Sequence, residues 1–250
     1  MKLIQRTFEI GLVCFLLFSI HSCTPYYALG NSGVDPIVFI KPVYADSAKV
    51  STYIGGKYTH TVDSAYSHKN EVNSFGQLNW SQTHTFEYYN FSYGAFGYLG
   101  TYKVAEVESF KGNKKYYGGG LSSEFCLNIP LKSVDLRPIG IKGSFYHENG
   151  DFARFRRIAA EQHLISGVTA SQFAYNVSFT SGYEFKYKNS SFGFDGSTGM
   201  TYFIGDEPAF LTFSANVHYA YKRYMAYLLF TESTFGIGEE YAVGFVYRIK

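Results

Sequence analysis

The chain has 250 residues and a formal net charge of +2, with 22 Lys and Arg residues against 20 Asp and Glu residues. This near-balanced charge gives no basic stripe for nucleic acid and no acidic tail, so we expect no nucleic-acid partner. Aromatic residues form 20% of the chain, as 24 Tyr, 24 Phe and 1 Trp, and Gly adds 25 residues. Rings and glycines at this density are typical of β-barrel walls rather than of a soluble core.

The first 22 residues have the features of a secretory signal peptide. Lys2 and Arg6 precede an apolar run over 10–20, which is too short to span a bilayer as a stable helix. The run ends in Ile20-His21-Ser22-Cys23, which resembles a bacterial lipobox, whose cysteine is diacylated and becomes the mature N-terminus. We therefore expect export by the secretory pathway and a lipid such as palmitate on Cys23. Ordinary cleavage nearby is the alternative.

Removal of residues 1–22 leaves a chain of single-domain size, and we place one barrel domain at 49–250. Residues 23–48 contain three prolines and are expected to form a lipid-anchored linker to the first strand. Residues 37–40 could instead fold into the lumen or add a strand. Within the barrel domain, Cys126 has no second cysteine with which to form an intramolecular disulfide.

Alternation of apolar and polar residues is the strongest pattern in the mature chain. Over 173–187 the aromatic and aliphatic residues fall mainly on alternate positions, and 192–204 and 211–221 repeat this pattern. Successive side chains of a strand point to opposite faces, so each run has one apolar face and one polar face. These runs reach or exceed the roughly 9–11 residues that a tilted strand needs to cross a bilayer.

The same pattern predicts an all-β fold, an up-and-down antiparallel transmembrane β-barrel of about ten strands. The expected strands are 49–60, 76–86, 88–104, 115–128, 134–146, 172–187, 191–204, 209–221, 224–234 and 239–249. The first, third and fifth connections are long, whereas the second, sixth and eighth are short, an asymmetry typical of outer-membrane barrels with short periplasmic turns. Segment 152–165 is the one helical stretch, and we expect a short helix in an extracellular loop that caps or lines the barrel mouth. A plain loop is the alternative.

The C-terminal segment 244–249 resembles the terminal-strand signal of outer-membrane barrels, although the chain ends on Lys250 instead of an aromatic residue. The resemblance implies recognition by the barrel-assembly machinery through Tyr241, Gly244, Phe245, Tyr247 and Ile249. The Gly- and Tyr-rich walls behind a lipobox resemble small barrel lipoproteins of the Bacteroidota. This resemblance implies a Gram-negative outer-membrane location and carries over no functional residue. In such bacteria, acidic residues just after the lipid cysteine tend to mark export to the cell surface. Residues 24–27 are uncharged here, so the resemblance also implies a lipid that faces the periplasm.

Several charged residues are predicted to point into the lumen, where they must pair or meet water. They are Glu124, Lys142, Glu184, Lys186, Asp195 and His218. We interpret the cluster as structural, with Glu124 and Lys142 as a salt bridge. The functional alternative is a proton- or substrate-handling site in which Asp195 or Glu184 orients His218 as a base. The six histidines after the signal have no metal-ligand spacing, so we expect neither a metal nor another cofactor.

The interior of a ten-stranded barrel is largely filled by side chains, which disfavours a general porin. The first hypothesis is therefore a non-enzymatic barrel with a structural, surface-contact or small-ligand-binding role. A narrow selective pore and a tethered periplasmic lipocalin-like binder, with apolar residues facing inward, are two alternatives. A further alternative is an outer-membrane protease or lipid hydrolase that uses residues at the rim: His60, His147, Asp151, Asp206 and Glu207.

Overall fold

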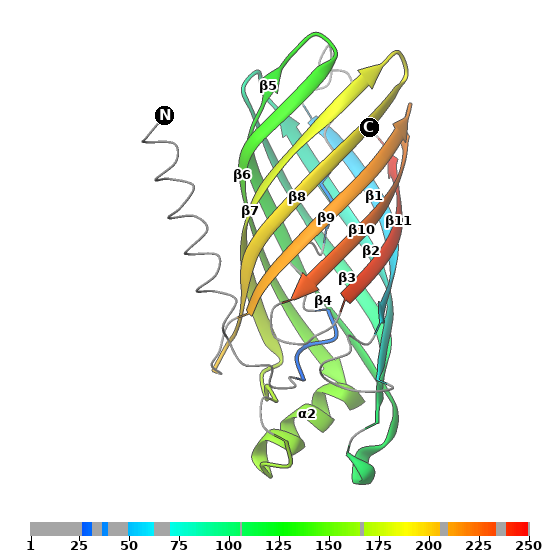
Figure 1. Ribbon diagram of the computed structural model, residues 1–250, viewed down its shortest axis with the longest axis vertical. Coiled ribbons are helices and arrows are strands. Elements are labelled where there is room, and N and C mark those ends of the chain that lie inside the picture. Colours follow the sequence, from blue (N-terminus) through cyan, green and yellow to red (C-terminus); the bar gives the residue numbers. More distant parts are fainter. Residues whose placement is uncertain are drawn as a thin grey trace, which may run out of the picture.

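The computed structural model describes residues 27–31, 37–39, 50–62, 71–105, 107–165, 168–205, 210–233 and 239–249. They contain one antiparallel sheet of eleven strands, of which β5 has only two residues, so ten long strands form the wall of a closed barrel (Figure 1). The predicted fold class is confirmed. The strands are β1 (Val50–Val62), β2 (Val72–Thr85), β3 (Tyr89–Val104), β4 (Gly112–Leu127), β5 (Ile129–Pro130), β6 (Val134–Gly150), β7 (Phe173–Tyr187), β8 (Ser190–Phe203), β9 (Phe210–Tyr221), β10 (Tyr224–Ser233) and β11 (Glu239–Arg248).

Neighbouring strands in the chain are neighbours in the sheet, and two further pairings complete the circle. The β1–β11 ladder joins the first and last strands, and β4 pairs directly with β6 past the short β5. The β6–β7 ladder shifts register between Arg137 and Gly140. Pro138 lies in this interval, and because proline cannot donate to a ladder, an interruption is expected there.

The two ends of the barrel differ. At one end the chain turns over 86–88, 131–133, 188–189 and 222–223, and we call this the short-turn end. At the opposite end lie the longer connections, with a 3-10 helix η1 (Glu108–Phe110) and a helix α2 (Asp151–Glu161), drawn at the bottom of Figure 1. We call this the α2 end. The predicted helix is confirmed, although it is shorter than 152–165.

Helix α2 forms where apolar residues recur at helical spacing. Phe152, Phe155 and Ala159 occupy positions i, i+3 and i+7 and are buried, while Arg154 and Arg157 on the other side are exposed. Gly150, with a φ of +114°, lets the chain turn from β6 into the helix. No helix among the described residues is long and apolar enough to cross a bilayer.

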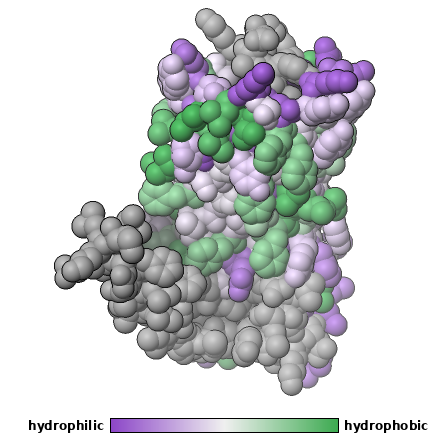
Figure 2. Space-filling model, turned by 45° about the horizontal axis from the view of Figure 1, so that its top comes forward, coloured by the Kyte–Doolittle hydropathy of each residue, from purple (hydrophilic) through white to green (hydrophobic). Residues whose placement is uncertain are grey.

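Along the wall, apolar side chains point outward and mostly polar ones point inward. In β7, Tyr175, Val177 and Phe179 are exposed, while Asn176 and Ser178 are buried. Hydrophobic residues spread over the wall below a hydrophilic rim in Figure 2. The lipocalin-like alternative, which required apolar residues on the inner face, is therefore wrong for this wall.

Strands β2 and β6 each extend four residues further toward the α2 end than the sequence pattern predicted. Strand β2 begins at Val72 instead of 76, and β6 continues to Gly150 instead of ending at 146. The inward side chains of these extensions, Asn73 and Glu148, both bind the backbone of Gly30 inside the barrel. These contacts with a distant part of the chain give the extensions a buried face that local alternation does not reveal.

The exposed apolar wall predicts that a charge at its middle is destabilising in a membrane. Leu228 is 64% exposed and is paired with Val243 and Val217 on the adjacent strands. We expect Leu228→Arg to cost about 2–4 kcal/mol in a bilayer, the range for arginine at the midplane of a barrel. Heat-modifiable gel mobility of the membrane fraction measures the folded share. The control is Asn113→Arg, which changes an exposed residue near the α2 end, and equal losses in both variants would contradict a lipid-facing wall.

Candidate functional site

A charged network occupies the lumen between its middle and the short-turn end, with Arg137 of β6 at its centre. The Arg137 guanidinium lies 2.8 Å from a carboxylate oxygen of Asp195 and 3.9 Å from one of Glu184. The other oxygen of Asp195 lies 3.4 Å from Nδ1 of His218. The structure thus brings three of the predicted residues together, around an arginine that the sequence pattern missed.

Glycines on neighbouring strands make room for this network. A side chain at Gly182 would collide with the carboxylate of Asp195, and one at Gly193 would collide with the imidazole of His218. Both glycines are directly paired with these residues, Gly182 with Asp195 and Gly193 with His218. The glycines of β7 and β8 therefore serve close packing inside the barrel.

The remaining predicted lumen residues also point inward. Lys186 forms an ion pair with Asp135. Glu124 and Lys142 are opposite each other in the β4–β6 ladder. Thr180 donates a 2.9 Å hydrogen bond to Glu124, and Nζ of Lys142 donates one of 2.6 Å to the carbonyl of Ile37. The Glu124–Lys142 salt bridge stays a prediction.

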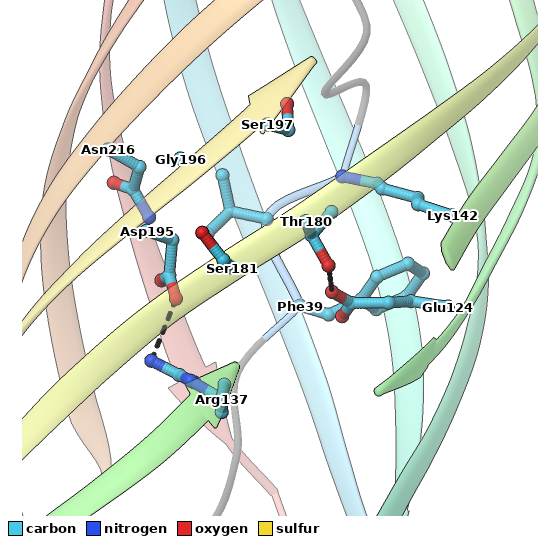
Figure 3. Close-up of a pocket in the computed structure, with 11 residues that line it drawn as sticks. Phe39, Glu124, Arg137, Lys142, Thr180, Ser181, Asp195, Gly196, Ser197 and Asn216 are labelled. Carbon is cyan, nitrogen blue, oxygen red and sulfur yellow. Dashed lines mark hydrogen bonds and ion pairs between the residues drawn. The ribbon is translucent and has the colours of Figure 1, made fainter. Parts of the chain in front are cut away.

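A cavity of about 40 Å³ lies beside this network, between Asp195 and Asn216 on one side and Lys142, Glu124 and Phe39 on the other (Figure 3). The side chain of Asn216 is buried, and neither its amide nitrogen nor its carbonyl oxygen has a hydrogen-bond partner among the described residues. A polar cavity of this size has room for a few water molecules or a small ion. It does not admit a protein or lipid substrate.

Part of the predicted linker lies inside the barrel. We call residues 27–31 and 37–39 the lumen segment. Ile37 and Phe39 are buried, and Nζ of Lys142 lies 5.4 Å from the centre of the Phe39 ring. For the described part of 37–40, folding into the lumen is therefore the arrangement that the structure adopts.

A buried ion pair fixes the other half of the lumen segment at the α2 end. Glu148 of β6 and Arg156 of α2 are 2.9 Å apart, and both side chains are fully buried. The second oxygen of Glu148 accepts a 2.7 Å hydrogen bond from the backbone N–H of Gly30. Arg156 donates to the carbonyls of Thr169 and Ser171, each at 2.9 Å. One ion pair thus ties a strand, the helix, the following connection and the lumen segment together.

Aromatic rings fill the space around this ion pair. The Tyr102 ring stacks on Phe152 with centroids 4.2 Å apart, and the Tyr27 ring meets the edge of Phe155 at 5.3 Å. Tyr116 lies beside Phe152 and is buried. Rings from β3, β4, α2 and the lumen segment consequently pack together inside the α2 end of the described lumen.

The rim candidates that the structure describes, His60, His147 and Asp151, are not brought together. His60 is exposed on β1, with Nδ1 2.8 Å from the hydroxyl of Ser74, and His147 packs against Phe173 on the outer face of β6. Strands β2, β3 and β4 separate these two histidines around the barrel. Asp151 is exposed at the start of α2, and Asp206 and Glu207 lie outside the described residues. In the described part of the chain, no three His, Cys, Asp or Glu side chains could share a metal ion.

The terminal strand β11 has the predicted division into faces. Tyr241 and Phe245 are exposed on the outside, whereas Gly244 is inward and leaves the space that the ring of Tyr227 fills. Ile249 donates a 2.9 Å hydrogen bond to the carbonyl of Thr52, which continues the closing ladder past Arg248. Recognition of this strand by an assembly machinery stays a prediction.

These features define the class: a closed antiparallel β-barrel with an apolar exterior and an occupied lumen. No protein-family model matches the sequence, and no curated protein matches it. Among solved structures, the chain is similar to an outer-membrane channel from Pseudomonas putida F1, with a TM-score of 0.46 and 9% identity over 84% of this chain and 100% of that one.

It is also similar to the β domain of the Bordetella autotransporter BrkA, with a TM-score of 0.45 and 10% identity over 80% of this chain and 99% of that one. A further match is OprG from Pseudomonas aeruginosa, with a TM-score of 0.38 and 12% identity over 81% and 96%. Identities and scores of this size assign no ligand or role to the chain.

The Glu148–Arg156 pair predicts a large stability change when one partner is removed. Arg156→Met leaves Glu148 buried without its cation, and we expect a loss of about 3–5 kcal/mol, typical of a broken buried pair. The double variant Glu148→Gln with Arg156→Met removes both charges and is expected to regain much of this loss. The temperature at which the folded band shifts to the unfolded mobility on a gel measures the loss of stability. Arg157→Met, an exposed neighbour on the same helix, is the matched control, and equal stability of the two single variants would contradict the pair's role.

Proposed function

We propose that this protein is a non-enzymatic barrel of a Gram-negative outer membrane, with a closed lumen and a contact surface at the α2 end. The observation that carries the proposal is the occupied lumen. Aromatic rings and the lumen segment fill one half, and the Arg137 network fills much of the other. The cavity beside Asn216, in the described part of the lumen, measures about 40 Å³.

The distribution of side chains and connections supports the membrane location. Large apolar residues are exposed on every long strand of the wall, and the inner face is mainly polar. Barrels of the outer membrane have short periplasmic turns and longer extracellular loops, so the short-turn end is assigned to the periplasm and the α2 end to the cell exterior. The signal peptide, a lipid on Cys23, assembly through β11 and the Bacteroidota type belong to the same proposal.

The α2 end has a surface suited to contact with a partner. Helix α2 uses its apolar side to cover the lumen, which leaves Arg154 and Arg157 exposed on the opposite side. These guanidinium groups suit contact with anionic groups of a partner or a lipid headgroup. The lumen cavity suits a small polar ligand or ordered water, which is the binding role compatible with its size.

Conductance in planar bilayers tests the closed lumen. The full chain is expected to give no steady ion current, because aromatic rings, the lumen segment and the Arg137 network occupy the described lumen. A variant that lacks residues 27–39 removes the lumen segment and is expected to conduct, with heat-modifiable mobility as the check that it has folded. Steady current through the unaltered chain, equal to that of the deletion variant, would instead favour the narrow selective pore.

A further inference from the structure

The described parts of the lumen segment lie between the α2 end and the middle of the barrel, and the segment runs against the direction of β1. Strand β1 starts at the short-turn end, where Val50 pairs with His84 just before the 86–88 turn. Ile37 lies in the middle of the lumen, where its carbonyl binds Lys142. Tyr27 lies at the α2 end and pairs with Val168 of the α2–β7 connection. The dark blue residues in Figure 1 accordingly lie just above α2.

The wall strands and the segments next to them hold the α2 end of this segment through several hydrogen bonds. The Tyr27 hydroxyl donates to Glu71, and its carbonyl accepts a 3.1 Å hydrogen bond from the N–H of Thr169. Asn73 donates a 2.7 Å hydrogen bond to the carbonyl of Gly30, and a side chain at Gly30 would collide with the Tyr116 ring. These contacts recognise both the backbone and the side chains of the segment, which fixes its direction and position.

The reach of the chain then limits where Cys23 can lie. Cys23 is outside the described residues, but it lies only four positions before Tyr27 in the chain. Four residues span at most about 14 Å when fully extended. The hydrocarbon core of a bilayer is about 30 Å thick. A group attached to Cys23 therefore cannot reach the interface at the short-turn end.

We propose that the mature N-terminus passes through its own barrel and leaves at the α2 end, which places the lipid of Cys23 in the outer leaflet at the cell surface. The proposal rests on the sidedness and the lipidation assigned under the proposed function. It is the opposite of the periplasm-facing lipid that residues 24–27 implied. The barrel is then both the conduit of the N-terminus and a second anchor beside the lipid.

Epitope labelling of the full chain in intact cells tests the threading. One variant carries a short epitope between Thr24 and Pro25, a second carries it after His163 beside α2, and a third carries it between Lys222 and Arg223. We expect antibody to label the first two on intact cells as strongly as after permeabilisation, and the third only after permeabilisation. Labelling of the His163 epitope without the Thr24 epitope would overturn the threading and leave the sidedness standing.

Two further results separate this inference from the proposed function. Labelling of the Lys222 epitope alone on intact cells would overturn the sidedness itself. Fatty-acid labelling that is the same in the full chain and in Cys23→Ala would overturn the lipid placement. If the epitope prevents folding, Thr24→Lys with an impermeant amine reagent replaces it. Peptide mapping is then expected to find the modified lysine on intact cells, and its protection there would overturn the threading.

Discussion

The buried ion pair between Glu148 and Arg156 is the interaction on which the rest of the structure depends. Burying two charges costs more than their attraction returns unless their other donors and acceptors are also satisfied. Here Gly30 supplies the donor for Glu148, and the carbonyls of Thr169 and Ser171 supply acceptors for Arg156. The pair is therefore stable only when the helix, the connection and the lumen segment are all in place. This mutual requirement links strand β6, the helix, the connection and the lumen segment at the α2 end.

The two ends of the lumen stabilise their buried charges in different ways. Near the short-turn end, charges neutralise one another around Arg137, and glycines give Asp195 and His218 room to approach. At the α2 end, aromatic rings exclude water around one ion pair. Between the two regions lies the cavity of about 40 Å³ beside Asn216, whose amide group has no hydrogen-bond partner among the described residues. A polar cavity of this size has room for a few water molecules or a small ion.

How much could be predicted from sequence depended on whether the relevant pattern was local. Strict alternation placed Glu184, Asp195 and His218 on the inner face, because side-chain direction in a strand has a period of two. Arg137 was missed because the irregularity at Pro138 changes the face of the residues before it, so that counting back from Lys142 puts Arg137 outside. A proline within an otherwise regular strand was the available signal. Glu148 was missed because it lies beyond the predicted end of its strand, and the lumen segment has no periodicity that could reveal its position.

The lumen segment is hydrogen-bonded to the wall at both of its described parts. Its backbone groups find partners on the wall: Glu148 for the N–H of Gly30, Asn73 for the carbonyl of Gly30 and Lys142 for the carbonyl of Ile37. These partners are themselves buried, and burying a polar group without a hydrogen bond is unfavourable. Segment and wall therefore stabilise each other.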